Sequence, residues 1–373
     1  MTRACRDRPA AFATRHFMPK SEQSKQDANL DVLRSIAVLA VLASHLAFYY
    51  VVLSPFWFSW GEFGVRIFFV HTSLVLMMSL DRLAARHSGV ALPFYIQRAF
   101  RIYPLSILCV LVVVTFHIRA NSFSIRYDRP STFMLISNLL LVQNITRVGS
   151  VSSPLWSLPY EMQMYAVLPF LYRLLKRHAE WWVMAALVVI SLGLGSLQLL
   201  FYFGKAVQFF PCFMGGILAF WLRRRQKAFF PAGLWPMWVI GVGFLYYAKS
   251  FFGDSFVGCL ILGASAGWFR DLTPGFGAAL AHQVAKYSYG IYLAHTPLLL
   301  LCFRILPLGS QAARWVLFLL LLPLVVTALF HGIESPLIKM GRRLTAPRKE
   351  APFDVPRLIT EIRSEGCGGA KKA

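Results

Sequence analysis

Five ionisable side chains lie within or at the edge of long apolar segments, where a charge is costly to bury. They are Arg34, His45, Glu161, His295 and Glu334. By insertion scales a charge in hydrocarbon costs at least ~2.5–3.5 kcal/mol, so each position needs an explanation. An imidazole with an unperturbed pKa near ~6.5, beside a carboxylate that orients it, suits general-base catalysis on a hydroxyl. Arginine side chains match the geometry of phosphate groups.

The positions of these residues along helices predict two polar layers. At about 1.5 Å per residue, Arg34 and His45 are roughly 16 Å apart and lie on nearly one helix face. The outer layer is expected to hold His45, Glu161 and His295. The inner layer is expected to hold Arg34, Glu334, Arg98 and Arg101. We expect His45 and Glu161 to be catalytic and the inner layer to bind a polyanion from the cytoplasm.

Structural explanations remain open for the same residues. Arginines at a membrane boundary can simply extend to the head groups. Buried histidines such as His45 and His295 can bond across helices without catalysing anything. Glu161 could belong to a purely structural pair, although a buried carboxylate needs a partner. His71, inside another apolar segment, is more typical of a structural residue than of a catalytic one.

The elements that must position these residues are apolar helices, and the fold class predicted is an all-α membrane protein. Only 14% of the 373 residues are charged, whereas soluble domains carry roughly 25%. About 20 apolar residues suffice to cross ~30 Å of hydrocarbon, which predicts a bundle of about ten transmembrane helices. The expected spans are 30–53, 61–80, 102–118, 155–175, 181–200, 207–222, 233–249, 255–269, 284–303 and 313–333, with a re-entrant or interfacial piece at 133–143.

Basic residues indicate the orientation of this bundle. The net charge is +22, and the basic residues cluster at the ends of apolar runs, as at 223–227. This positive-inside pattern predicts that both termini are cytoplasmic and that anionic membrane lipids are partners. No soluble segment carries a basic stripe interleaved with aromatics, which argues against nucleic acid. The six cysteines lack metal-ligand spacing, so no metal site is expected.

Three regions are expected along the chain. Residues 1–29 are polar and basic without an apolar core, which predicts a cytoplasmic N-terminal tail and not a signal peptide. Residues 30–338 form the transmembrane domain. Residues 339–373 are basic and then glycine-rich, which predicts a disordered cytoplasmic tail.

Six motifs resemble those of one family, in the same order along the chain. They are LDVLRSIAVLAVLASH at 30–45, GVRIFFV at 64–70, RAFRIYPL at 98–105, PLWSLPYEMQMYAVLP at 154–169, YSYGIYLAHTPLL at 287–299 and IESPLI at 333–338. On these motifs the chain is identified as a member of the multi-span membrane acyltransferases, called acyltransferase family 3. The family includes bacterial O-acetyltransferases that act on O-antigen, exopolysaccharide and nodulation factor.

The resemblance implies transfer of an acyl group from cytoplasmic acyl-CoA to a hydroxyl of an extracytoplasmic or lipid-linked glycan, in the bacterial inner membrane. Acetyl-CoA is the expected co-substrate, and no bound cofactor is expected. The family's catalytic residue corresponds to His45, whereas the role of Glu161 is inferred from its chemistry. The acyl-CoA site implied by the resemblance comprises Arg34, Arg98, Arg101 and Glu334. Acceptor or supporting roles are expected for His295, Trp156, Tyr165 and Tyr287.

One segment departs from the family pattern and keeps other functions open. The family usually reads Val-Ile-Ser-Gly where this chain has Val-His-Thr-Ser at 70–73, and Arg66 stands where the family often has Asp. A non-catalytic acyl-sensing or scaffold homologue would fit this departure. A transporter or flippase also uses intramembrane charges, although no half-to-half repeat is visible. Whether His45 acts as a base or carries the acyl group stays open.

Overall fold

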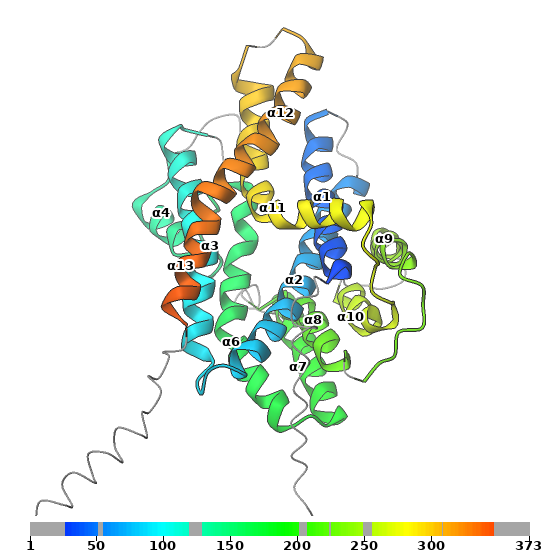
Figure 1. Ribbon diagram of the computed structural model, residues 1–373. Coiled ribbons are helices and arrows are strands. Elements are labelled where there is room, and N and C mark those ends of the chain that lie inside the picture. The colour runs from blue at the N-terminus through cyan, green and yellow to red at the C-terminus, as the bar shows by residue number, and fades with distance from the viewer. Residues whose placement is uncertain are drawn as a thin grey trace, which may run out of the picture.

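The computed structural model describes residues 27–50, 55–118, 129–200, 207–223, 225–248, 256–307 and 309–346 (Figure 1). Within these residues the regular elements are helices, apart from one isolated bridge between Phe230 and Phe269. The prediction of an all-α protein is therefore confirmed. Nearly all of the predicted N-terminal tail, and residues 347–373 of the predicted C-terminal tail, lie outside the described residues.

The chain runs through thirteen named α-helices in the described part, joined in places by single turns of 3₁₀ or π-helix. The α-helices are α1 (Ala28–Tyr50), α2 (Pro55–Ala84), α3 (Ala91–Thr115), α4 (Thr132–Leu139), α5 (Gln143–Thr146), α6 (Leu158–Arg177), α7 (Trp181–Leu200), α8 (Phe210–Leu222), α9 (Leu234–Tyr247), α10 (Phe256–Ser265), α11 (Phe276–Leu300), α12 (Gln311–Leu329) and α13 (Ser335–Leu344). The 3₁₀ turns are η1 (Ser153–Ser157) and η3 (Ala266–Trp268), and the π-helical turns are η4 (Leu301–Ile305) and η5 (Phe330–Glu334).

Four stretches of helix are long and apolar enough to cross a membrane: 28–47, 55–84, 91–115 and 311–344. They identify the chain as an integral membrane protein. The predicted count of about ten spans is not confirmed, because four other apolar helices have only 10–17 residues within the described part. α6 and α11 have 20 and 25 residues but interrupt their apolar sequence with polar side chains.

Small residues allow the helices around α2 to pack closely. A Cβ atom at Gly64 would press on the backbone of Ala37 in α1, and one at Gly216 in α8 would collide with the Val70 carbonyl oxygen. A Cβ at Gly263 in α10 would collide with the backbone of Gly215. Interfaces of this kind are typical of membrane helices, where close backbone approach increases van der Waals contact.

The departure at 70–73 is accommodated at this same crossing. Ser73 is buried on α2, and its hydroxyl donates to the carbonyl oxygens of Phe69 and Val70 at 2.8 and 3.1 Å. The serine that replaces the family's usual glycine therefore satisfies its own hydroxyl, and Gly216 on α8 leaves room for it.

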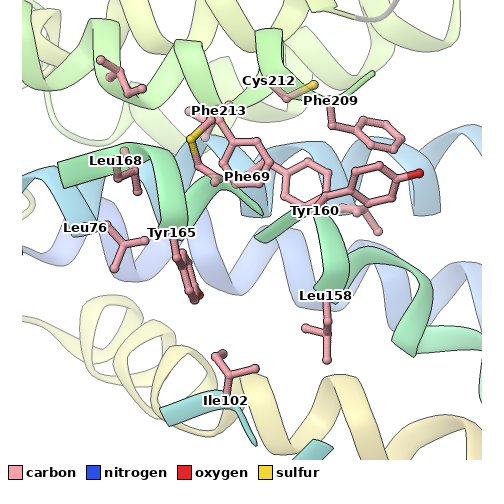
Figure 2. Packing of buried hydrophobic residues seen from close by; sticks show 14 of the residues in the cluster. Phe69, Leu76, Ile102, Leu158, Tyr160, Tyr165, Leu168, Phe209, Cys212 and Phe213 are labelled. Atoms are coloured by element: carbon pink, nitrogen blue, oxygen red, sulfur yellow. The ribbon is translucent and has the colours of Figure 1, made fainter. Parts of the chain in front are cut away.

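Aromatic and aliphatic side chains from α2, α3, α6 and α8 form the main core (Figure 2). Phe69 of α2 stacks on Phe213 of α8 with ring centroids 4.5 Å apart, and Tyr160 of α6 meets Phe209 edge-on at 4.8 Å. Ring pairs of this geometry contribute about 0.5–1.5 kcal/mol each beyond the area they bury. This core fixes the mutual positions of α2, α6 and α8.

α11 crosses α1 (Figure 1), and three α11 residues spaced seven apart contact it. Ser35 of α1 donates to the carbonyl oxygen of Ala281 at 2.7 Å, Arg34 donates to Ser288, and the rings of His45 and His295 are in contact. One face of α11 is thus fixed along the length of α1.

α13 packs on α3 and continues further than expected. Gly341 of α13 lies against Phe100, and the Gln97 side-chain amide donates to the Thr345 hydroxyl at 2.7 Å. The tail was predicted to be disordered from residue 339, but the helix continues to Leu344 because these contacts hold it on α3.

The packing predicts that Gly216→Ala destabilises the bundle. The new Cβ would meet the backbone of α2, and overpacking of this kind costs about 1–3 kcal/mol. Gly193→Ala on α7 is the matched control, since nothing lies within 4 Å of the added Cβ and alanine is the better helix former. Thermal unfolding in detergent should show a lower midpoint for Gly216→Ala only. Equal midpoints for the two variants would contradict the packing.

Candidate functional site

A cavity lies between α1, α2, α3, α6 and α11 and holds about 660 Å³ of space free of protein atoms, part of it open to solvent. Its wall carries three cations, Arg34 of α1 and Arg98 and Arg101 of α3. Glu161 of α6 and His71 of α2 also line it, together with the tyrosines Tyr165, Tyr289 and Tyr292. Ligand sites commonly have a few polar groups on a largely apolar wall.

Two of the arginines are held by partners from distant helices. The Nε of Arg34 donates a short hydrogen bond to the Ser288 hydroxyl of α11, which in turn donates to the Ala285 carbonyl oxygen at 2.8 Å. Arg101 forms an ion pair with Glu334, with 2.7 Å between the nitrogen and the oxygen. The Glu334 side chain is only 1% exposed, so Arg101 is its counter-ion in a nearly dry environment.

A local irregularity of the helix brings Glu334 to Arg101. α12 contains Pro323 and continues into the π-helical turn η5, which ends at Glu334 before α13 begins. The wider turn changes the rotational position of the residues after it, and such turns often occur at functional sites. The Glu334 side chain thereby faces Arg101 on α3, so the two residues share one layer as predicted.

Glu161 lies in the cavity with the arginines and not in the outer layer where it was predicted. It accepts a hydrogen bond from the Tyr165 hydroxyl at 2.7 Å, and the charges of Arg34, Arg98 and Arg101 act on it. The prediction counted depth from the start of an apolar run. The hydroxyl of Tyr95 on α3 instead donates to Ala166 on α6 at 3.0 Å, which places Glu161 level with Arg98 and Arg101.

The segment before α6 explains this depth. The hydroxyl of Tyr103 donates to the Leu140 carbonyl oxygen at 3.2 Å, so the end of α4 lies within one helical turn of Arg101 along α3. The Asn138 amide donates to the carbonyl oxygens of Met134 and Gly149 at 2.9 Å, which folds residues 132–151 against the bundle. The segment before α6 therefore lies beside α3 near Arg101, and this fixes the level at which α6 begins.

His45 forms a pair with His295. Their ring centroids are 4.9 Å apart in an edge-on arrangement. Nδ1 of His295 lies 3.0 Å from the carbonyl oxygen of Ile291, which can only accept, so we assign the proton to Nδ1. Both nitrogens of His45 and Nε2 of His295 are buried, without a hydrogen-bond partner in the described part of the chain. Buried nitrogens of this kind need an explanation, and a bound substrate is one.

Tyr292 connects the histidine pair to the cavity. It lines the cavity, shares a hydrogen bond of 2.7 Å with the Ser157 hydroxyl, and its ring centroid lies 6.2 Å from that of His295. Since Arg34 and His45 lie on the same helix, the cavity and the histidine pair are neighbouring parts of one region.

The remaining predicted residues divide between the cavity and its surroundings. Tyr165 lines the cavity and bonds to Glu161. Trp156 packs on Tyr160 and Phe209 in the core, and Tyr287 bonds to His331 at 3.3 Å; neither lines the cavity. His71, interpreted from sequence as structural, lies on the cavity wall. The one sequence feature that could have indicated this position is that His71 lies in the segment 70–73, which departs from the family pattern.

Among the described residues, no group of histidine, cysteine and carboxylate side chains could hold a metal ion. The charged side chains of the cavity wall are instead three arginines and one carboxylate, that of Glu161. Such a site suits an anion with several phosphate groups, because arginine binds phosphate oxygens in a bidentate manner.

Comparison with known proteins gives one family and several relatives. Residues 27–331 match the family described as "Acyltransferase domain". The chain is 27% identical over 360 residues to the peptidoglycan O-acetyltransferase OatA of Listeria monocytogenes, covering 84% of this chain and 56% of the relative. It is 24% identical over 371 residues to the putative peptidoglycan O-acetyltransferase YrhL of Bacillus subtilis, covering 87% and 57%.

A putative O-acetyltransferase of Staphylococcus aureus is 28% identical over 225 residues, covering 54% of this chain and 36% of the relative. The chain therefore spans about half the length, or less, of the curated relatives it matches. No solved structure matches it.

The buried ion pair predicts that Arg101→Ala strongly destabilises the protein. Removing one partner leaves the Glu334 carboxylate buried without a cation, which costs about 3–5 kcal/mol. Arg223→Ala is the matched control, because its pair with Asp27 is 45% exposed on the arginine side and should be worth less than about 1 kcal/mol. Thermal unfolding in detergent measures both variants.

Adding Glu334→Gln to Arg101→Ala should recover part of the lost stability, since the uncompensated charge is removed. If Arg101→Ala unfolds at the same temperature as Arg223→Ala, the pair does not stabilise the bundle.

Proposed function

We propose, from the premise that this chain belongs to the acyltransferase domain family, that it is a membrane O-acetyltransferase. The donor in this proposal is acetyl-CoA from the cytoplasm, and the acceptor is a hydroxyl of an extracytoplasmic or lipid-linked glycan. The observation that carries the proposal is that Tyr292, in the wall of the cationic cavity, also lies beside a histidine pair. Three nitrogens of that pair have no hydrogen-bond partner in the described part of the chain.

The cavity supports binding of the donor. The nucleotide end of acetyl-CoA carries several phosphate charges, and three arginines face one cavity that also extends along apolar side chains such as Val65, Phe68 and Leu76. The cationic part would hold the phosphate end, and the apolar part would accept the uncharged pantetheine arm. The acyl group would then extend past Tyr292 towards His45.

The histidine pair supports the transfer step. His45 would take the proton from the acceptor hydroxyl while its oxygen forms a bond to the thioester carbonyl carbon. Collapse of the tetrahedral intermediate breaks the carbon–sulfur bond, and the imidazolium returns the proton to the leaving thiolate. The products are the O-acetyl ester and free CoA. His295, with its Nδ1 proton committed to Ile291, would receive or share a hydrogen bond through Nε2.

Glu161 has a different part in this proposal from the one expected from sequence. Its carboxylate lies among Arg34, Arg98 and Arg101 and accepts from Tyr165, so it would orient the guanidinium groups that hold the donor. Its negative charge also offsets part of the repulsion between the three cations.

The acceptor and the location follow from the relatives and from charge. The first two relatives carry peptidoglycan in their names, so peptidoglycan is the first acceptor to test. The basic ends of the helices favour both termini in the cytoplasm, which would place His45 towards the outer face of a bacterial inner membrane.

The test is a His45 series read out as glycan O-acetylation. His45→Ala and His45→Gln should both lower the rate of acetyl transfer by about 10²–10⁴-fold, because neither side chain can take up a proton near neutral pH. The O-acetyl content of the glycan should fall accordingly. Glutamine could replace a merely structural hydrogen bond, so it separates the two roles. His178→Ala, at the exposed end of α6, is the control and should retain activity.

O-acetyl groups on purified cell-wall glycan can be quantified by NMR, with protein levels matched by immunoblot. An active His45→Gln protein would remove His45 as the base. Absence of O-acetylation by the wild-type protein on every glycan fraction would contradict the proposed function itself.

A further inference from the structure

A second group of arginines lies at the end of the bundle where α2 ends and α13 packs on α3. We call Arg82, Arg86 and Arg342 the mouth cluster. All three side chains are exposed, and the charges of Arg86 and Arg342 both act on Arg82. The contacts of Gly341 with Phe100 and of Thr345 with Gln97 hold Arg342 at this place.

Arg98 connects the mouth cluster to the cavity. It lines the cavity beside Arg101, and the charges of Arg342 and Arg82 also act on it from the other side. Its Nε atom is buried and has no hydrogen-bond partner in the described part of the chain. A continuous line of cations therefore leads from the exposed end of α2 to the interior of the bundle.

Carboxylates compensate this line only in part: the charge of Glu161 acts on Arg98, and that of Asp81 acts on Arg82. Arg101 has Glu334, but neither Arg82 nor Arg342 forms an ion pair among the described residues. The neighbouring carboxylate of Asp81 is engaged by Lys176 at 2.7 Å and by the Tyr172 hydroxyl at 2.9 Å. The positive-inside rule explains why arginines are frequent at one end of a membrane bundle. It does not explain why Arg82 and Arg342 both lie near Arg98. Like charges repel, and a bridging polyanion removes that cost.

We propose that Arg82 and Arg342 bind the 3′-phosphate of the acyl-CoA nucleotide, while Arg98 binds its pyrophosphate at the entrance of the cavity. This inference rests on the proposed function and adds a second phosphate site to it. The 3′-phosphate distinguishes CoA from 3′-dephospho-CoA. The mouth cluster would therefore make the protein bind CoA and its thioesters in preference to the dephosphorylated forms.

The experiment compares CoA with 3′-dephospho-CoA by calorimetry on the full chain in nanodiscs of neutral lipid. Wild-type protein should bind CoA about 10- to 100-fold more tightly, the range expected when charge-assisted hydrogen bonds are lost. The double variant Arg82→Gln/Arg342→Gln should weaken CoA binding to the level of dephospho-CoA and leave dephospho-CoA binding unchanged. Arg343→Gln, an exposed neighbour on α13, is the control and should behave like wild type.

Each outcome bears on the proposal. Equal affinity of the wild-type protein for the two ligands would overturn it, as would a double variant that loses both ligands equally. If the double variant binds CoA normally in neutral nanodiscs and loses only its response to added anionic lipid, the mouth cluster is a headgroup site and the proposal is wrong. Absence of binding to CoA in any form would instead refute the proposed donor, a result distinguishable from failure of the second site alone.

Discussion

The burial of positive charge between helices is the constraint on which the rest of this structure depends. Three arginines face one cavity, and their mutual repulsion in a poorly polarisable environment is tolerable only with compensating groups. Glu334 neutralises Arg101, Ser288 holds Arg34, and Glu161 lies among all three. The π-helical turn before Glu334 and the glycine-mediated packing around α2 both serve this arrangement, since each brings a distant segment within reach of the cavity.

The arrangement also separates two chemical tasks along α1. The end of the helix near Arg34 is cationic and suits phosphate groups. The end near His45 holds two imidazoles, three of whose nitrogens have no hydrogen-bond partner among the described residues. α11 follows α1 and supplies Ser288 at one level and His295 at the other. A donor with phosphate groups at one end and a thioester at the other matches these two ends of α1. A glycan hydroxyl could then approach His45 from the side away from the arginines. In the proposed function, this pair of crossing helices would support acyl transfer from one side of the membrane to the other.

Much of this site could be predicted from sequence because its residues lie in short motifs within helices. The eleven-residue spacing of Arg34 and His45 already placed them on one face, and Arg98 and Arg101 are one turn apart. The depth of Glu161 could not be predicted, because it depends on long-range bonds from Tyr95 and Tyr103 that position α6 and the segment before it. The number of spans could not be predicted either, since several apolar helices have only 10–17 residues in the described part of the chain, fewer than the ~20 that cross a bilayer. His71 was interpreted as structural because a lone histidine in an apolar run resembles a packing residue, and its place on the cavity wall depends on the packing of α2.

The central claim is that one bound donor joins the arginine cavity to the histidine pair. A cryo-EM structure of the protein with a non-transferable thioether analogue of acetyl-CoA tests it most directly. The account predicts phosphate density against Arg98 and an acyl carbon beside His45. The gap between them should leave room for one hydroxyl oxygen within about 3 Å of a ring nitrogen, the reach of a hydrogen bond. Density in which the acyl end stops at Glu161, with Tyr292 still between it and His45, would contradict the account and move the chemistry into the cavity.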